Sequence, residues 1–247
     1  MQEMSPPLPW LSPGQGFPPP AQAWGPDDPA PGLLAAGADL SPQTLVSAYS
    51  QGIFPWFSPG QPILWWSPDP RMVLLTGNFK LHRSLRRVIR QFAKTPGCEI
   101  RVDGDFSRLM ACCAQAPRKG QGGTWIVPQM IEAYKGLNAA GLAHSVETWV
   151  DQQLVGGLYF VNLGGMVFGE SMFAQRRDAS KIALAALVVM CRRQGLDLID
   201  CQQSTSHLTS LGACDMPRPE FLARVAERIE RGVANWHFDR LYWSEIA

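Results

Sequence analysis

The order of segments in the second half of the chain most limits the folds that it can adopt. Three apolar stretches separated by turn residues indicate an antiparallel meander. A helical segment then begins at Asp178, ends before Gly195, and leads into a fourth apolar stretch. The four predicted strands span residues 143–150, 152–161, 165–172 and 196–202. A meander followed by a crossover helix and one more strand predicts an α+β domain with a mixed, mostly antiparallel sheet.

Helical segments are predicted on both sides of these strands. Ser41 is followed by Pro42, a preferred first helical residue, and the helix that they begin ends before Gly52. Further helices are predicted over residues 80–94, 105–116, 128–141 and 219–232. A final strand is predicted over residues 238–243.

The first 31 residues hold ten of the 21 prolines of the chain. Proline has no backbone N–H to donate and does not fit inside a helix, so this stretch is extended or disordered. The sequence therefore predicts a poorly ordered arm over residues 1–31. Trp10 and Trp24 are the side chains within it that could attach it to the folded body.

Charge and composition exclude several classes of protein. The 22 Lys and Arg residues nearly balance the 21 Asp and Glu residues, so the chain is not basic throughout, as a histone-like binder is. No apolar run reaches the roughly 18 residues of a membrane helix, and the first residues do not resemble a secretory signal. The six cysteines include no C-x-x-C pair and the four histidines are dispersed, which disfavours a zinc site. We therefore expect a cytoplasmic protein with reduced thiols, no bound metal and no membrane span.

Residues 80–94 carry the most one-sided charge of the chain. Five apolar residues recur there at helical spacing and predict a buried stripe. The cations on the other side are Arg83, Arg86, Arg87, Arg90 and Lys94, and no acidic residue lies between them. A charge run is usually a solvated face, but a face of one sign in a nearly neutral chain favours a polyanionic partner.

Two aromatic segments interrupted by proline lie close together, at residues 53–57 and 63–71. The prolines prevent the segments from forming one helix and indicate loops and short strands. Such segments either hold flat side chains around a pocket or form ordinary core, and both interpretations remain open at this point.

Polar residues stand at the ends of two otherwise apolar strands. Because side chains alternate along a strand, Asp200 and Gln202 share one face, and Glu170 lies at the end of the neighbouring strand. An acid and an amide among hydrophobic residues are costly to bury unless they are paired. The three residues indicate a site that holds a cation or an amine, with a satisfied core network as the alternative.

Eight sequence blocks together resemble the leucyl/phenylalanyl-tRNA–protein transferase family. They are YSQGIFPWF (49–57), WWSPDPR (65–71), GTWI (123–126), AHSVE (143–147), LVGGLY (154–159), GESMF (169–173), ASK (179–181) and IDCQ (199–202). The resemblance runs in the same order from about Gly32 to Phe221. The chain departs from the family pattern at Val127, Asn138 and Phe160, and Phe160 adds bulk on the sheet.

This resemblance implies a small N-terminal domain over residues 32–70 and a GNAT-like (acetyltransferase-like) domain over residues 71–247. It also implies that the enzyme moves Leu, Phe or Met from aminoacyl-tRNA to the N-terminal α-amine of proteins beginning with Arg or Lys. Proteins labelled in this way are marked for degradation by the N-end rule. Because an aminoacyl ester is already activated, no cofactor, metal or covalent nucleophile is expected. We expect the enzyme to act as a monomer.

The resemblance assigns catalytic roles as well. Gln202 contacts the attacking amine, Asp200 polarises Gln202, and Glu170 positions the ribose or the aminoacyl amine. An amide is a weak base, however. It therefore remains open whether Gln202 takes part in proton transfer or only orients the amine, with the tRNA ribose hydroxyl or water carrying the proton.

The remaining assignments concern binding. The residues implied in binding the substrate are Tyr49, Trp56, Trp125, Val167, Met172 and Ile199. The two tryptophans stack on or near the 3′ adenosine, and the last three residues line the pocket for the amino-acid side chain. The arginines of the basic face follow the phosphates of the tRNA acceptor stem; they are Arg83, Arg86, Arg87 and Arg90.

Two rival functions make different demands on the sequence. An acyl-CoA-dependent N-acyltransferase on the same fold needs a glycine-rich pyrophosphate loop before the crossover helix, and residues 176–180 (RRDAS) contain no glycine. A non-enzymatic RNA-binding module would need the aromatic residues and the basic face. It gives no reason for Glu170, Asp200 and Gln202 to converge.

Overall fold

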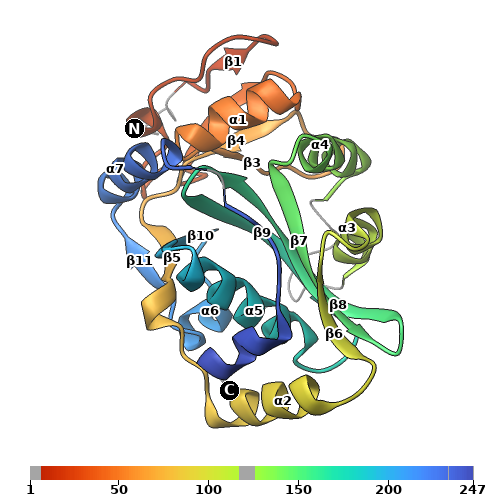
Figure 1. Cartoon of the computed structure of the whole chain (residues 1–247). Coiled ribbons are helices and arrows are strands. Elements are labelled where there is room, and N and C mark those ends of the chain that lie inside the picture. The colour runs from red at the N-terminus through yellow and green to blue at the C-terminus, as the bar shows by residue number, and fades with distance from the viewer. Residues whose placement is uncertain (1–6, 117–125, 233, 247) are drawn as a thin grey trace.

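The computed structural model describes residues 7–116, 126–232 and 234–246, and in this part the chain forms two β-sheets surrounded by helices (Figure 1). The smaller sheet lies within the first 70 residues. Its strands, in spatial order, are β1 (Trp10–Leu11), β2 (Leu33–Gly37), β4 (Leu64–Trp66) and β3 (Phe54–Pro55). This sheet packs above one end of the larger one.

The larger sheet has the spatial order β11–β5–β10–β9–β8–β7–β6. The bounds are β5 Arg71–Leu75, β6 Cys98–Val102, β7 Ala143–Val150, β8 Gln153–Leu163, β9 Met166–Ala174, β10 Leu198–Gln202 and β11 Cys214–Met216. Strands β6 to β9 pair antiparallel, and so do β10, β5 and β11. Only the pair β9 and β10, joined through helix α5, is parallel. The predicted α+β class with a mixed, mostly antiparallel sheet is confirmed.

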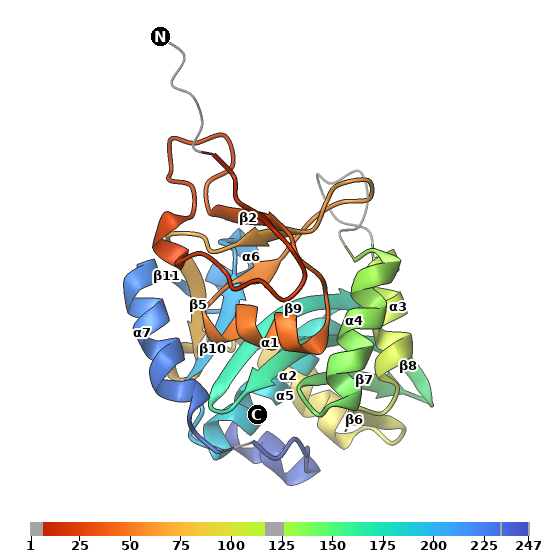
Figure 2. The ribbon, with the colours of Figure 1, turned by 90° about the horizontal axis from the view of Figure 1, so that it is seen from above.

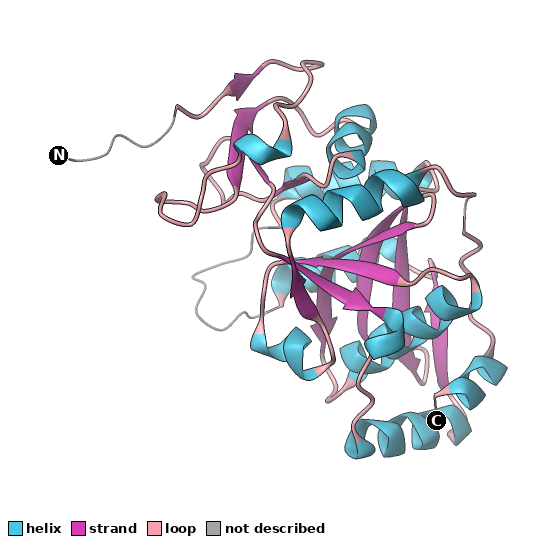
Figure 3. Ribbon diagram, turned by 90° about the vertical axis from the view of Figure 1, so that its left-hand side faces the viewer, coloured by secondary structure: helices cyan, strands magenta, loops and turns pink. Residues whose placement is uncertain are grey.

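Helices cover both faces of the larger sheet (Figures 2 and 3). One face carries α1 (Pro42–Ser50), α3 (Phe106–Gln115), α4 (Pro128–Ala139) and α7 (Arg218–Ile229). The other face carries α2 (Arg83–Lys94), α5 (Ala179–Arg193), α6 (Ser206–Ser210) and the 3₁₀ helix η3 (Arg240–Glu245). Shorter 3₁₀ turns are η1 (Pro20–Gln22) and η2 (Thr76–Asn78). Each set of helices buries its own apolar core against the sheet.

Helix α1 shows how local sequence sets the element bounds. The Ser41 hydroxyl accepts a hydrogen bond from the backbone N–H of Thr44 (3.3 Å), and Pro42 occupies the first helical position, as predicted. After the helix, Gly52 has φ +69° and is pressed against α7. A Cβ atom at Gly52 would lie 2.5 Å from Cδ2 of Leu222, so this turn requires glycine.

Most elements predicted from the sequence are present. The predicted helices correspond to α1, α2, α3, α4, α5 and α7, and the four predicted strands to β7, β8, β9 and β10. The strand predicted over residues 238–243 is wrong. The Asp239 carboxylate accepts a hydrogen bond from the Leu241 N–H (2.8 Å) and thereby begins the 3₁₀ helix η3 instead.

The first residues differ from the prediction of a poorly ordered arm over residues 1–31. In the part described, residues 7–31 form β1 and η1 and lie against the small sheet. The carbonyl groups of Pro9 and Leu11 accept hydrogen bonds from Ala36 and Ala38 (2.9 and 2.6 Å). Proline lacks an N–H but keeps its carbonyl, so a proline-rich segment can still pair along the edge of a sheet.

Side chains also attach this segment to the small domain. Leu11 is 3% exposed, and the Phe17 ring packs edge-to-face on Trp65, with 4.7 Å between ring centroids. Of the two tryptophans expected to hold the segment, Trp10 is 68% exposed and Trp24 is half-buried.

The structure bears on three further expectations. All six cysteines are free thiols. No helix within residues 7–116, 126–232 and 234–246 has the length and apolar character needed to cross a bilayer. In the same ranges, no group of His, Cys, Asp and Glu side chains is arranged to hold a metal ion.

Candidate active site

A cavity of about 820 Å³ opens where β9 and β10 separate. The two strands pair at Ile199–Val167 and Asp200–Phe168, below the cavity. Its apolar wall comes from β8, β9, α5 and β10 and consists of Leu158, Met172, Leu184, Leu187 and Ile199. Phe54 and Trp56 of the small domain close one side, and α6 closes another. The cavity is thus enclosed by both domains.

Two polar side chains meet in the wall of this cavity. Nε2 of Gln202 donates a hydrogen bond to Oε1 of Glu170 (2.9 Å), which connects the ends of β10 and β9. Among the described residues that line the cavity, Glu170 is the one carboxylate. A carboxylate and an amide on a mostly apolar surface provide a place for a cationic or hydrogen-bonding group.

Two buried tyrosines hold Glu170 from below. Tyr49 on α1 donates to Oε1 (2.7 Å), Tyr134 on α4 donates to Oε2 (2.9 Å), and the two hydroxyl oxygens lie 2.5 Å apart. Burial and the charge of Glu170 raise the pKa of both tyrosines well above the usual value. Both hydroxyls therefore remain protonated donors at neutral pH.

The environment of Glu170 also changes its own acidity. Burial raises the pKa of this carboxyl to about 7, although the hydrogen bonds from Tyr49 and Tyr134 lower it. The charge of Asp200 raises the pKa further, and the charge of Arg71 opposes that effect. Glu170 therefore changes protonation state near neutral pH, where a carboxyl in water is fully ionised.

Asp200 is fully buried and forms a two-point ion pair with Arg71 of β5. Nε and Nη2 of Arg71 donate to the two carboxylate oxygens of Asp200 (2.8 and 2.7 Å). The guanidinium lies between the rings of Phe54 and Phe221, 4.7 and 4.6 Å from their centroids. Its Nη1 donates to the carbonyl of Gly52 (3.0 Å).

The contact between Asp200 and Gln202 differs from the expected one. Oδ1 of Asp200 accepts from the backbone N–H of Gln202 (2.9 Å), so it touches the backbone and not the side-chain amide. The strand register shifts between these residues, and Gln202 has φ +63°. Both side chains bind groups on the side of the sheet covered by α1, α4 and α7, as the alternation along the strand predicted.

The other predicted site residues lie at different depths. Met172, Ile199 and Trp56 line the cavity, and Trp66 packs edge-to-face on Trp56 with 5.3 Å between centroids. Val167 is fully buried in the core and does not line the cavity. Tyr49 is likewise fully buried and does not line the cavity, but it donates a hydrogen bond to Glu170, which does. Trp125 lies outside the described residues.

Several residues of the site were missed from the sequence. Leu184 and Leu187 stand three residues apart on α5, a spacing that puts them on one face of the helix, but the helix is apolar on all sides. Leu158 and Arg71 lie inside the LVGGLY and WWSPDPR blocks but had no role assigned, and Tyr134 carries no local signal that separates it from core residues.

The predicted basic face is exposed on α2. Arg83, Arg86, Arg87 and Arg90 point to solvent, while Leu85, Ile89 and Phe92 are buried in the core that α2 shares with α5. The four arginines do not line the cavity. They form a separate cationic surface on the same side of the sheet as α5.

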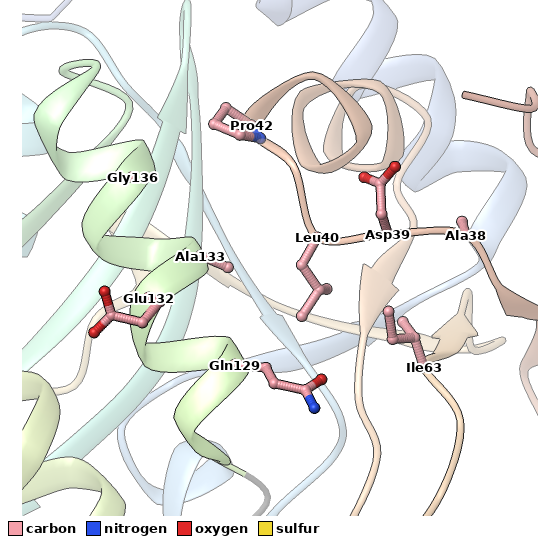
Figure 4. A pocket seen from close by; sticks show the side chains of 9 residues that line it. All are labelled: Ala38, Asp39, Leu40, Pro42, Ile63, Gln129, Glu132, Ala133 and Gly136. Atoms are coloured by element: carbon pink, nitrogen blue, oxygen red, sulfur yellow. The ribbon is translucent and has the colours of Figure 1, made fainter. Parts of the chain in front are cut away.

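A second, shallower hollow of about 410 Å³ lies between the start of α1 and α4 (Figure 4). Asp39 accepts hydrogen bonds from Ser41 and Thr44, and Glu132 is paired with Lys135. Figure 4 shows the two carboxylates pointing in different directions. The hollow therefore lacks converging polar groups, and the larger cavity is the candidate active site.

Comparison with known proteins shows the family of this chain. The family described as leucyl/phenylalanyl-tRNA protein transferase matches residues 73–226, and the N-terminal domain of that family matches residues 38–69. A leucyl/phenylalanyl-tRNA–protein transferase of Polaromonas sp. is 58% identical over 246 residues, covering 100% of this chain and 96% of the relative. The relative of the same name from Albidiferax ferrireducens is 57% identical and covers 100% and 97%.

Among solved structures, the similarity is lower. FemX is 11% identical and covers 76% of this chain and 71% of its own, with a TM-score of 0.42. A GCN5-related N-acetyltransferase from Kribbella flavida is 12% identical and covers 72% and 61%, with a TM-score of 0.35. The assignment therefore rests on the sequence matches.

The chain is an aminoacyltransferase, an enzyme that moves an amino acid from tRNA to protein. It belongs to the leucyl/phenylalanyl-tRNA–protein transferase family. The rival function, an N-acyltransferase that uses acyl-CoA, is not favoured by these matches.

Proposed function

We propose that this enzyme acts in the cytoplasm as a monomer and transfers Leu, Phe or Met to the N-terminal α-amine of proteins that begin with Arg or Lys. Such proteins would thereby be marked for degradation by the N-end rule. The contact between Gln202 and Glu170 at the wall of the cavity carries this proposal, since it offers an acceptor and a negative charge to an incoming amine.

The reaction needs alignment more than activation. The amine nitrogen attacks the ester carbonyl carbon, the bond from this carbon to the ribose oxygen breaks, and an amide forms. As the amide forms, the neutral amine loses one proton and the departing ribose oxygen gains one; the proton that the ammonium form of the N-terminus loses before attack is a separate one. Holding the amine and the ester together contributes up to roughly 7–11 kcal/mol, so the residues of the cavity act mainly by positioning.

Gln202 would orient the amine. Because its Nε2 is held by Glu170, the amide oxygen is the end left to accept a hydrogen bond from the incoming amine. Glu170, with a pKa of about 7, would accept the proton that the amine must lose before it attacks. Tyr49 and Tyr134 hold the carboxylate in place for this step.

Asp200 and Arg71 would act as positioning residues. Neither lines the cavity, but Asp200 binds the backbone of Gln202 and Arg71 fixes Asp200. This arrangement holds the strained backbone of Gln202 at φ +63°. We therefore assign Asp200 to the conformation of Gln202 and not to polarisation of its amide.

The apolar wall would select the amino acid. Leu158, Met172, Leu184, Leu187 and Ile199 form a surface for an apolar side chain that is not branched at Cβ, as in Leu, Met and Phe. One methylene is worth only about 1–3 kcal/mol in such a pocket. Trp56 would stack on the 3′ adenosine, and a base stacked on an aromatic ring contributes about 1–3 kcal/mol. Arg83, Arg86, Arg87 and Arg90 on α2 would bind acceptor-stem phosphates.

A transfer assay tests the proposal. The enzyme is incubated with Phe-tRNA, Leu-tRNA or acetyl-CoA and with peptides that differ only in their first residue. We expect product from the two aminoacyl-tRNAs with peptides beginning with Arg or Lys. Acetylation of these peptides, or equal use of a peptide beginning with Ala, would contradict the proposed substrates.

A further inference from the structure

Three cations lie on the connection between β9 and α5 and on the first turn of α5, outside the basic face of α2. Arg176 and Arg177 are exposed, with 95% of the Arg177 side chain open to solvent, and Lys181 stands on the first turn of α5. We propose that Arg176, Arg177 and Lys181 bind backbone phosphates of the tRNA acceptor end between the cavity and α2. This inference rests on the proposed use of aminoacyl-tRNA.

The connection lies at the same end of the sheet as the C-terminus of α2 (Figure 1). The backbone N–H groups of Gln175 and Arg176 donate to the carbonyl of Val155 on β8 (2.8 and 3.1 Å). At the same end, the N–H of Asp151 in the β7–β8 turn donates to the carbonyl of Gly97, three residues after α2 (2.9 Å). Strands β9 and β6 are three strand spacings apart in the sheet, which is about 15 Å, and β6 directly follows α2 in the chain.

Two arginines lie near Cys98, between the connection and α2. Burial raises the pKa of the Cys98 thiol at the start of β6, and nearby Arg176 and Arg240 lower it. Arg240 in turn donates to the carbonyl of Ala93 on α2 (2.7 Å). Arg176 and Arg240 therefore both lie near Cys98, and Arg240 in turn contacts α2, which carries Lys94 and the arginines of the basic face.

The other end of this surface reaches the cavity. Lys181 lies one helical turn before Leu184, which lines the cavity. Burial and the charge of Lys181 lower the pKa of His207, and His207 also lines the cavity. Lys181 therefore lies near the cavity edge formed by α6.

Two carboxylates lie along the same surface. Asp178 is 2.8 Å from Nζ of Lys181 and 3.6 Å from Nε of Arg177, and Asp151 lies near Cys98. An exposed ion pair is worth only about 0–1 kcal/mol, so Asp178 does not prevent Arg177 from binding a phosphate. Cations remain in excess along the whole path, and this pattern fits a phosphodiester backbone.

The path has a direction that suits the substrate. The ester at the 3′ end of the tRNA must enter the cavity, while the stem must lie outside it. The 3′ end of the tRNA, followed outward from the cavity beside α6, would meet Lys181 first, then Arg177 and Arg176, and then α2. The contacts are to phosphates and not to bases, so they are expected to be the same for tRNAs that carry Leu, Phe or Met.

The test compares a full and a minimal substrate. The double variant Arg176→Ala/Arg177→Ala is assayed with Phe-tRNA and with phenylalanine esterified to adenosine, which lacks the stem phosphates. We expect weaker binding of Phe-tRNA, and a salt dependence of log K that is less steep by about 0.7–0.9 for each phosphate that the variant no longer binds. Transfer from the adenosine ester is expected to match the wild type. Arg224→Ala, on α7 at the opposite face, is the control.

The outcomes separate this inference from the proposed function. An unchanged salt dependence overturns the inference, and so does an equal loss of transfer with both substrates, which would indicate a damaged cavity. A third outcome is also informative. If the salt dependence of Phe-tRNA binding is less steep in the double variant than in the wild type, but the wild type transfers no amino acid, the inferred phosphate contacts are supported and the proposed function is contradicted.

Discussion

Nε2 of Gln202 and Oε1 of Glu170 lie 2.9 Å apart across the gap where β10 leaves β9. This hydrogen bond connects the two strands where they separate. Because it uses Nε2 of Gln202, the amide oxygen is the atom that we expect to accept a hydrogen bond from a substrate. Because the carboxylate is held from the other side by Tyr49 on α1 and Tyr134 on α4, a change on either helix reaches the cavity through Glu170.

Replacing Gln202 tests its role in orienting the amine. Gln202→Ala is expected to lower kcat for transfer by about 10²-fold or more, since it removes the acceptor for the amine. The dissociation constant for Phe-tRNA is expected to change by less than about twofold, because the phosphate contacts remain. Single-turnover rates and binding assays measure the two effects. Gln153→Ala, at an exposed position on β8, is the control, and an equal loss of binding and transfer would contradict the role.

The pH dependence of transfer tests Glu170. If the ionised carboxyl accepts the proton, kcat/KM falls as the pH drops through about 7, where Glu170 becomes protonated. Tyr134→Phe removes a hydrogen bond that lowers this pKa, so the fall moves to higher pH, by about one unit or more for a bond to a charged group. Tyr242→Phe, on η3, is the control. A profile that does not move in Tyr134→Phe would exclude Glu170 as the proton acceptor.

The buried pair of Arg71 and Asp200 is expected to dominate the stability of the site. Arg71→Ala leaves the Asp200 charge buried without a partner and should lower the free energy of unfolding by about 3–5 kcal/mol. Arg224→Ala, which removes a partly exposed ion pair, should cost less than about 1 kcal/mol. Urea unfolding measures both values. Similar costs for the two variants would show that Asp200 is not held by Arg71 in the way described.

The N-terminal segment provides a matched pair of variants at neighbouring positions. Leu11 is buried, whereas 68% of Trp10 is exposed. Leu11→Ala should lower the free energy of unfolding by about 2–5 kcal/mol, and Trp10→Ala should change it by less than about 0.5 kcal/mol. Thermal or urea unfolding distinguishes them. Equal, small effects would mean that residues 7–31 do not contribute to the folded domain as the structure indicates.

The parts of the fold that depend on local sequence were predictable. The hairpin of β7 and β8, the strand β9 and the helix α5 each follow from turn residues and apolar patterns within about 20 residues. The polar residues Glu170 and Gln202 were predictable as well, because they interrupt apolar strands. Short strands such as β5 and β11 were not, since their pairing partners lie far away in the chain.

The missing parts of the site are long-range pairs. Arg71 and Asp200 are 129 positions apart, and Tyr49 and Tyr134 are 85 apart. Nothing near Tyr134 in the sequence separates a buried hydroxyl that binds Glu170 from a tyrosine in ordinary core. The proline-rich start was misjudged for a different reason. Composition shows that proline residues have no backbone N–H to donate to a neighbouring strand. It does not show whether that strand pairs only with their carbonyl groups, as β2 does here.

The hydrogen bond from Arg71 to the carbonyl of Gly52 limits how freely the two halves of this enzyme can be exchanged during evolution. A chimera that takes its first 70 residues from a relative must bring a glycine turn of the same shape, or the arginine loses one of its anchors. The candidate active site therefore draws on both parts of the chain, and the first 70 residues cannot be treated as a detachable module.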